Sequence, residues 1–376
     1  MAIAELKSIL FRIIIFTLKI FVKKDNNLIV YMPLHDPKKF TGNLKAQYLY
    51  GIKHEPTYNH VYISRDINVY NFLNKNKYPV VMGTISTLML LAKTKCVIID
   101  ATTSYLTHPS YKIIQLWHGS GIKNVGLLND NTKGYFLNAF KKHYQQYYIV
   151  ASTSKYDAAK HNDSFNISTA AVTGIPRNDI FFSGKSYQRE LKEKYNLAKY
   201  DKIISYAPTF RDAFNKQPLD STGWEELNNF LSKSNAVFVV NKHPFDKDFI
   251  VPDNLSNILD LTQVMQDVQE LLIITDILIS DYSSIVTDFA ITRRPTIYYL
   301  YDHQEYITTN RSTYKPIEEI LPGPFIFQQN QLLQHLQNLD WFEDVAYQKR
   351  YQQFLDIFHQ YFDGDAAKRI FQKVKE

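Results

Sequence analysis

The stretch that decides the fold is Tyr111–Lys123, YKIIQLWHGSGIK, in which an apolar run is followed by a histidine, two glycines and a lysine. A buried strand that ends near Trp117 and turns through Gly119 and Gly121 would leave His118 at its carboxyl end, where α/β proteins bind ligands. A histidine in such a turn can also do no more than satisfy a backbone carbonyl. The stretch alone leaves both interpretations open.

Similar short apolar runs recur on both sides of this stretch, with helical or loop segments between them. They begin at Asn27, Asn59, Tyr78, Lys95 and Tyr147, and again at Lys202, Ala236, Asp276 and Pro295. Continuous rather than alternating apolar runs indicate strands that are buried on both faces of a parallel sheet. We therefore predict an α/β protein of two Rossmann-type domains that face a central cleft.

The length of 376 residues suits two such domains better than one. We expect an N-terminal acceptor domain over residues 25–185 and a C-terminal donor domain over residues 200–330, joined by the polar stretch before Asp201. Residues 331–376 have a helical pattern, and we expect these helices to pack across both domains.

The first 24 residues combine an apolar segment with scattered cations, and they lack the small-residue cleavage site of a signal peptide. Four polar residues fall on one narrow helical stripe: Ser8, Arg12, Lys19 and Lys23. This pattern predicts an amphipathic helix in a membrane interface, with its cations near anionic headgroups. The alternative is a helix that packs on the protein's own core, with Lys7, Arg12 and Lys19 extending to water. Its internal charges count against a transmembrane span.

The composition narrows the classes of partner. A formal net charge of +6 favours anionic partners, but no basic block or RNA-binding aromatic motif accompanies it, so we expect no nucleic-acid partner. A single cysteine, Cys96, excludes an intramolecular disulfide and a paired-cysteine metal site, and it fits a reducing cytosol.

In the second half of the chain, polar motifs follow two predicted strands. YAPTFRD places Pro208, Thr209 and Arg211 just past a strand, where an arginine can bind phosphate oxygens with two hydrogen bonds. VVNKHPF puts Lys242 and His243 at the end of the next strand. The plainer alternatives are an Arg211 paired with a carboxylate and a His243 that belongs to the core.

A third motif, ISDYSSIVTDFA, ends a strand at Asp281 and begins a helix near Ser283 and Ser284. The serine hydroxyls and the free backbone N–H groups of a helix start would make an anion site, or the serines only cap the helix. Asp288, one turn later, faces either the predicted cleft or water.

Several common catalytic signatures are absent. The sequence contains no G-x-G-x-x-G, G-x-x-x-x-G-K-[ST], G-x-S-x-G or H-E-x-x-H motif, so dinucleotide, P-loop, serine-hydrolase and zincin sites lack their signatures. No carboxylate cage for Mg²⁺ is evident, so we predict no protein metal site and leave a divalent-ion requirement open.

The motifs QLWHGSGIK, TGIPRND (Thr173–Asp179), YAPTFRD, KHP and DYSSIVTDFAITRRPTIYYLYDHQEY, in that order, resemble the CDP-glycerol glycerophosphotransferase family of teichoic acid and capsule polymer synthesis. The resemblance covers roughly residues 95–310. The usual form of the first motif has Thr and Pro where this chain has Ser120 and Gly121, a change that keeps the hydroxyl and loosens the turn.

The resemblance implies a GT-B fold and a CDP-glycerol or CDP-ribitol donor held mainly by the C-terminal domain. It also implies a lipid-linked acceptor, either a polyprenyl-diphosphate saccharide or a growing polymer, and peripheral attachment to the cytoplasmic face of the cell membrane. His118 is then the expected catalytic base, because an imidazole titrates near working pH. His243, Arg211, Ser283 and Ser284 are expected to bind the diphosphate, His243 as a second catalytic residue. The expected substrate-binding set is completed by Gly119, Ser120, Lys123, Pro208, Thr209, Lys242, Asp281 and Asp288.

Two other functions stay open beside a transferase that releases CMP. One is a sugar-nucleotide glycosyltransferase or epimerase on the same fold, and the other is a catalytically silent scaffold protein. The sequence does not decide between glycerol and ribitol, between a primase and a polymerase, or between acceptors, and it does not reveal the oligomeric state.

Overall fold

The computed structural model describes residues 2–102, 111–128, 141, 143–209, 211, 217–242, 246, 248–309 and 313–376. The chain divides into two compact units. Unit 1 consists of Met1–His118, Val125–Asp179 and Gln360–Glu376, and unit 2 consists of Gly119–Asn124 and Ile180–His359. His243 and the segment around it, 243–245, lie outside the described residues.

Unit 1 contains a seven-stranded sheet in the order β3-β2-β1-β4-β5-β6-β7. All of its neighbouring strands run parallel. The strands are β1 (Asp25–Met32), β2 (Asn59–Ser64), β3 (Val80–Met82), β4 (Thr94–Ile99), β5 (Lys112–Gln115), β6 (Tyr147–Ser152) and β7 (Ala170–Val172). Their carboxyl ends therefore share one edge of the sheet.

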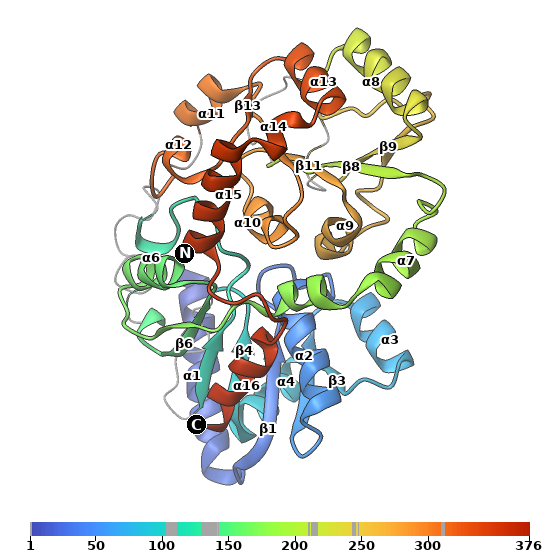
Figure 1. Ribbon diagram of the computed structural model, residues 1–376. Helices are drawn as coiled ribbons and strands as arrows, with labels where there is room; N and C mark the ends of the chain where they lie inside the picture. The colour runs from blue at the N-terminus through green and yellow to red at the C-terminus, as the bar shows by residue number, and fades with distance from the viewer. Residues whose placement is uncertain are drawn as a thin grey trace. The chain divides into compact units, whose positions relative to one another are not determined.

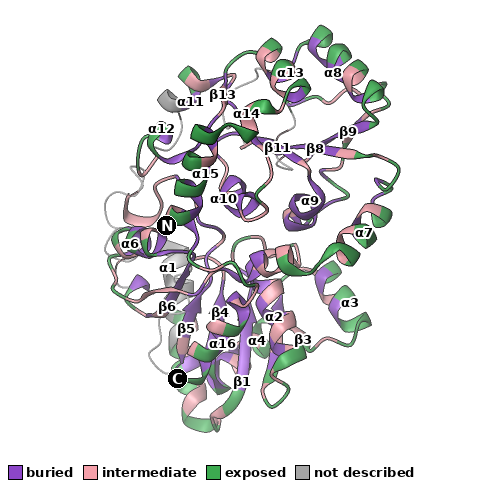
Figure 2. Cartoon of the chain, in the orientation of Figure 1, coloured by how far each residue is buried: buried purple, intermediate pink, exposed green. Residues whose placement is uncertain are grey.

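Helices cover both faces of this sheet (Figure 1). One face packs against α1 (Ala2–Phe21), α4 (Thr84–Lys93) and α6 (Lys155–Phe165). The other packs against α2 (Gly42–His54), α3 (Ile67–Lys75) and α16 (Ala366–Lys375). The continuous apolar runs of the sequence are thus explained, because the inner strands β1, β2, β4, β5 and β6 are mostly buried, whereas the edge strands β3 and β7 are only partly buried (Figure 2).

Unit 2 contains a six-stranded parallel sheet in the order β10-β9-β8-β11-β12-β13. Its strands are β8 (Lys202–Tyr206), β9 (Ala236–Val240), β10 (Ile258–Asp260), β11 (Ile277–Ser280), β12 (Thr296–Tyr299) and β13 (Phe325–Ile326). One face packs against α8 (Ser221–Lys233) and α13 (Gln329–Gln337), the other against α7 (Lys185–Lys194) and α9 (Val268–Ile274).

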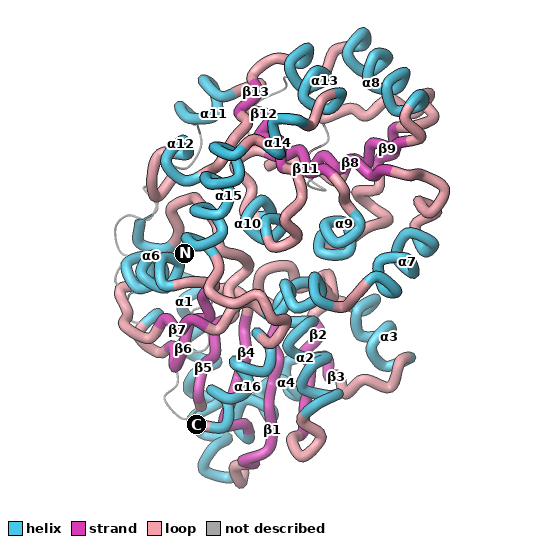
Figure 3. Tube along the Cα trace, viewed as in Figure 1, coloured by secondary structure: helices cyan, strands magenta, loops and turns pink. Residues whose placement is uncertain are grey.

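Shorter elements complete the two units (Figure 3). Unit 2 also contains α10 (Ile285–Ala290), α11 (His303–Thr309), α12 (Ile317–Ile320), α14 (Asp340–Glu343) and α15 (Val345–Phe358). Unit 1 contains the 3-10 turn η1 (Gly126–Leu128), whereas the 3-10 turn η2 (Pro176–Phe182) begins in unit 1 and ends in unit 2. The helices after residue 328 divide, since α13, α14 and α15 belong to unit 2 and α16 to unit 1. The α/β, GT-B-like fold of two parallel-sheet units is confirmed, and the cleft between them stays a prediction.

The N-terminal segment forms a helix, α1, and the two stripe residues whose side chains are described differ: Lys19 is partly buried, whereas Lys23, just past the helix, is exposed. Ile15 of α1 is buried in the core of unit 1, and Lys19 places its Nζ 5.1 Å from the ring centre of Tyr111. Large apolar side chains are exposed instead: Leu10, Ile13, Phe16, Ile20 and Phe21. The alternative of a helix on the protein's own core therefore describes one side of α1. Among the helices in the described ranges, none has the length and apolar character to cross a bilayer.

Candidate active site

The turn after β5 contains an unusual backbone conformation. Trp117 has a φ of 56° and Gly119 a φ of 140°, so the left-handed positions are Trp117 and Gly119 rather than the expected pair of glycines. The left-handed region costs a non-glycine residue about 1–2 kcal/mol, and a bulky residue adopts it only where its surroundings impose it.

Three polar side chains of unit 1 impose this turn. The side-chain oxygen Oε1 of Gln115 accepts a hydrogen bond from the backbone N–H of Trp117 at 2.9 Å. Asn43 Nδ2 donates to the carbonyl of Trp117 at 2.9 Å, and Arg177 Nη1 donates to the carbonyl of His118 at 2.9 Å. The backbone groups of the turn are therefore fixed by segments that lie far apart in the sequence.

The imidazole of His118 is held by its neighbours in unit 1. It stacks on His35 with ring centres 4.2 Å apart and an interplanar angle of 4°, and Trp117 lies 4.2 Å away on a tilted plane. His118 Nδ1 lies 3.4 Å from the carbonyl oxygen of Asp100. A carbonyl only accepts, so a proton on Nδ1 satisfies this contact and leaves the lone pair of Nε2 as the proton acceptor.

The charge state of His118 follows from its surroundings. Burial, with a smaller contribution from His35, lowers the pKa of His118 to about 3. Burial likewise lowers the pKa of His161, on the neighbouring helix α6, to about 4. Both imidazoles are therefore neutral near pH 7, and His118 starts in the state that accepts a proton.

In unit 2, Asp281 organises the turns after β8 and β11. Its carboxylate accepts hydrogen bonds from the backbone N–H of Thr209 at 2.9 Å and from the Thr209 hydroxyl at 2.6 Å. It also accepts from Arg211 Nη2 at 2.8 Å. Two of the motifs singled out in the sequence, YAPTFRD and ISDYSS, are thus joined by one carboxylate.

Arg211 forms a buried ion-pair network with two carboxylates. Its Nε lies 2.5 Å from Asp302 Oδ2, and its Nη1 donates to the carbonyl of Thr209 at 2.6 Å. The side chain is 5% exposed, and those of Asp281 and Asp302 are each 1% exposed. Burial opposes the charge of Arg211, but the two carboxylates outweigh it and raise the pKa of the guanidinium. To bind a phosphate directly, Arg211 would have to break one of these hydrogen bonds.

The glycine loop after His118 lies with unit 2 and brings further candidates near this network. The carbonyl of Ser120 accepts a hydrogen bond from Thr287 Oγ1 at 2.7 Å, and Ser120 itself is buried. A methyl group on Gly121 would lie 3.5 Å from Ser284 Cβ. Lys123 Nζ lies 5.3 Å from the ring centre of Tyr306, the ring that the Arg211 guanidinium covers at 4.7 Å.

The two serines lie at the start of α10 as expected. Ser284 occupies the cap position without a side-chain cap bond, and Ser283 Oγ lies 3.5 Å from the N–H of Ile285. Asp288 is buried within the same helix, where its carboxylate accepts from Gln269 Nε2 at 2.9 Å. Ser284 is therefore placed near the loop residue Gly121, whereas Asp288 takes part in a buried contact.

The remaining predicted residues differ in their surroundings. Pro208 is half-buried between β8 and Thr209. Lys242 Nζ donates to the carbonyl of Phe249 and lies 3.6 Å from Asp260 Oδ2, a contact that involves none of the other candidates. Within the described ranges, no group of three or more His, Cys, Asp or Glu side chains could hold a metal ion.

Sequence reasoning did not assign roles to four residues that shape these turns: His35, Asn43, Asp100 and Arg177. It gives Asp302 only as a residue that could reach the predicted cleft. One signal was available for Asp100, because CVIID and LISD end two predicted strands in the same way. Asp100 accepts hydrogen bonds from the backbone N–H groups of Leu34 and His35 at 2.7 and 3.0 Å, as Asp281 does from Thr209. The amide and guanidinium contacts of Asn43 and Arg177 leave no comparable pattern in the sequence.

Three comparisons place the chain among known proteins. It is 32% identical over 276 residues to the teichoic acid ribitol-phosphate polymerase TarK of Staphylococcus aureus, a match that covers 70% of this chain and 52% of TarK. The chain thus spans about half the length of that relative. It is 26% identical over 398 residues to the teichoic acid glycerol-phosphate transferase of the same species, covering 95% of each chain.

Among solved structures, the wall teichoic acid polymerase TagF superposes with a TM-score of 0.78 at 24% identity, over 94% of this chain and 89% of that chain. This likeness concerns the fold. A family model described as CDP-Glycerol:Poly(glycerophosphate) glycerophosphotransferase matches residues 14–376. The resemblance seen in the motifs is therefore confirmed, and the chain belongs to the CDP-glycerol:poly(glycerophosphate) glycerophosphotransferase family.

Proposed function

We propose that this protein transfers glycerol phosphate or ribitol phosphate from a CDP-alditol to a lipid-linked acceptor, releasing CMP, in teichoic acid or capsular polymer synthesis. The family match over residues 14–376 supports this activity, and relatives named as glycerol-phosphate and ribitol-phosphate enzymes support both donors. The acceptor is a polyprenyl-diphosphate saccharide or a growing polymer.

The observation that carries the proposal is the neutral, oriented imidazole of His118 at the carboxyl end of β5. In the proposed step, His118 Nε2 takes the proton of an acceptor hydroxyl. The oxygen of that hydroxyl forms a bond to the phosphorus that bears the alditol. The bridging P–O bond breaks, and its electron pair leaves with CMP. A general base of this kind contributes about 10²–10⁴-fold to the rate. An anionic diphosphate nearby would favour the imidazolium as it forms.

The diphosphate is assigned to unit 2. Lys123, the serine hydroxyls and the backbone N–H groups at the start of α10 supply positive partial charge on one unit, and their grouping around Tyr306 and Gly121 supports this assignment. Arg211 holds the surrounding turns through Asp281 and Asp302 rather than binding the substrate first. His243, outside the described residues, keeps its expected role.

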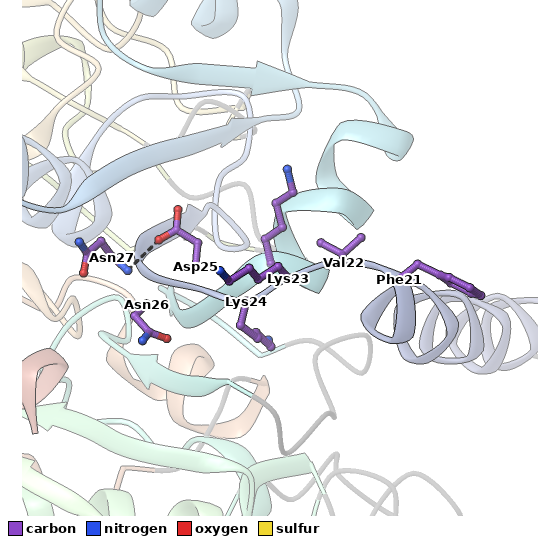
Figure 4. Close-up of a pocket in the computed structure, with 8 residues that line it drawn as sticks. Phe21, Val22, Lys23, Lys24, Asp25, Asn26 and Asn27 are labelled. Atoms are coloured by element: carbon purple, nitrogen blue, oxygen red, sulfur yellow. Dashed lines mark hydrogen bonds between the residues drawn. The ribbon is translucent and has the colours of Figure 1, made fainter.

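Attachment to the cytoplasmic face of an anionic membrane is assigned to α1 and the turn that follows it. The exposed apolar side chains of α1 lead into an open depression of 710 Å³ lined by Phe21–Asn27 and Lys93 (Figure 4). Burial, and then the charge of Lys24, lowers the pKa of Lys19 to about 8. Apolar surface beside crowded lysines is the combination that an anionic lipid surface complements.

The experiment that tests the activity is CMP release by purified protein with a lipid-linked disaccharide acceptor in detergent. CDP-glycerol, CDP-ribitol and UDP-sugars are compared as donors, with His118→Ala beside the wild type. We expect acceptor-dependent CMP release from a CDP-alditol that falls at least about 100-fold in His118→Ala. His54→Ala is the matched control, because His54 is an exposed histidine of unit 1 stacked on Tyr50.

The alternatives predict other results. Release of UDP from a UDP-sugar, with neither CDP-alditol used, would make the protein a glycosyltransferase or epimerase and remove the role of His118. Silence with every donor, together with binding to vesicles, would indicate the scaffold function.

A further inference from the structure

The Asn43 side chain uses both ends of its amide in unit 1. It is buried at 3% exposure in the first turn of α2. Its Nδ2 donates to the carbonyls of Trp117 and, at 3.5 Å, Leu116, while its Oδ1 accepts from the backbone N–H of Arg177 at 3.1 Å. A buried amide with this set of partners cannot rotate without leaving a backbone group unpaired.

Arg177 completes the arrangement from η2. Its backbone is fixed by Asn43, and its Nη1 reaches the carbonyl of His118 at 2.9 Å. Asn43 and Arg177 together thus bind two successive carbonyls, those of Trp117 and His118, at the point where the backbone enters the left-handed region. An observed backbone outlier held by surrounding polar groups is the situation in which strain serves a site.

We propose that Asn43 and Arg177 form a clamp that positions His118 for catalysis, each acting through the backbone of the turn rather than on the substrate. The inference rests on the proposed function, in which His118 is the base. Without the clamp, the turn relaxes toward an ordinary conformation and the imidazole leaves the stack with His35 and the contact with the Asp100 carbonyl. Misplacing a reacting group by about 1 Å lowers a rate about 100-fold.

The clamp also contributes to the charge state of the base. The groups that face His118 are His35 after β1, the Asp100 carbonyl after β4, His161 on α6 and the Arg177 guanidinium. The positive charge of Arg177 opposes protonation of His118, whereas the Asp100 carbonyl favours it. Replacing Arg177 with a neutral residue therefore raises the pKa of His118, an effect that a purely structural contact would not have.

The test combines two readouts on the full chain. Steady-state kinetics of Asn43→Ala and Arg177→Gln should show kcat lowered about 10- to 100-fold, with KM for the CDP-alditol within about threefold of the wild type because the donor is assigned to unit 2. Arg177→Lys keeps the charge and one donor, so its kcat should recover part of the loss. Arg369→Gln is the matched control, since Arg369 pairs with Asp363 and the Thr173 carbonyl.

The second readout is a proton NMR titration of the His118 ring, assigned by its loss in His118→Ala. Arg177→Gln should move its pKa upward, and Arg369→Gln should leave it unchanged. Wild-type kcat together with a wild-type titration in folded Asn43→Ala and Arg177→Gln would overturn the clamp. If the wild type turned over no CDP-alditol, the proposed function would fail, while the titration would still report whether Arg177 acts on His118. If Asn43→Ala failed to fold, the Arg177→Gln and Arg177→Lys pair would decide.

Discussion

The turn after β5 in unit 1 and the turn after β11 in unit 2 both follow buried parallel strands, yet they treat charge in opposite ways. In unit 1, a neutral imidazole is held through its backbone, and its ring edge is left for chemistry. In unit 2, Arg211 and two carboxylates pair with one another under nearly complete burial. The end of a strand therefore indicates where polar side chains gather, but not whether they serve a substrate or each other.

Of the substitutions considered, Arg211→Ala should lower the free energy of unfolding most. Arg211→Ala leaves Asp281 and Asp302 buried without their cation, and breaking a buried ion pair in this way lowers the free energy of unfolding by about 3–5 kcal/mol. Urea unfolding followed by fluorescence measures the loss. Arg350→Ala, at an exposed arginine of unit 2, is the control. A loss below about 1 kcal/mol for Arg211→Ala would mean that the network is held by other contacts.

Removing His118 should do the reverse, with a large effect on turnover and a small one on stability. His118→Ala is expected to lower kcat at least about 100-fold, or about 2.7 kcal/mol of transition-state stabilisation. Its free energy of unfolding should change by about 1 kcal/mol or less, because the ring is half-buried and neutral. Measuring CMP release and urea unfolding on one preparation separates the two. A full rate would contradict the base assignment.

Acidification should destabilise unit 1 through His118 and His161. In the unfolded chain a histidine titrates near 6.5, whereas His118 and His161 in the folded chain titrate at about 3 and about 4. Between these values the unfolded state binds more protons, so this stability is present above pH 6.5 and is lost as the pH falls. His161 alone contributes up to about 1.4 kcal/mol per pH unit. Denaturant unfolding at pH 7, 6 and 5 should give a shallower decline in His161→Gln, and equal slopes would refute the explanation.

The smallest effect is expected at the amino end of the unit 1 sheet, where the turn before β1 carries lysines beside apolar surface. Lys23→Gln and Lys93→Gln should each weaken binding to vesicles with anionic lipid by about 1 kcal/mol, with little change on zwitterionic vesicles. Vesicle sedimentation at two salt concentrations measures this, with Lys368→Gln, at an exposed lysine of α16, as the control. Equal affinity for anionic and zwitterionic vesicles would mean that the lysines do not contribute to membrane binding and that only the apolar side chains do.

Sequence patterns located every inner strand of the two sheets but only one of their four edge strands. Each apolar run predicted as a strand contains one, including the short edge strand β3, whereas the edge strands β7, β10 and β13 were not predicted. These three strands have only two or three residues and lie at the edges of the sheets, so they have no long apolar run to detect.

The candidate site was also predicted only in part. The positions of His118, Arg211 and Asp281 at strand ends followed from the local sequence. The stacking of His35 on His118 and the pairing of Arg211 with Asp302 are tertiary contacts, which no local pattern specifies. The strained residue was also unexpected, because glycines normally occupy left-handed positions and here Trp117 does.

The return of the chain to unit 1 through residues 360–376 has a consequence for biosynthesis. Ile370, Phe371 and Val374 of α16 complete one face of the first sheet, and Asp179 accepts hydrogen bonds from the first N–H groups of that helix at 3.0 and 2.9 Å. During translation the part of this face that α16 covers stays exposed until all of unit 2 has been synthesised. The N-terminal sheet is therefore made first but completed last, and the apolar surface that it exposes in the meantime is of the kind that chaperones protect.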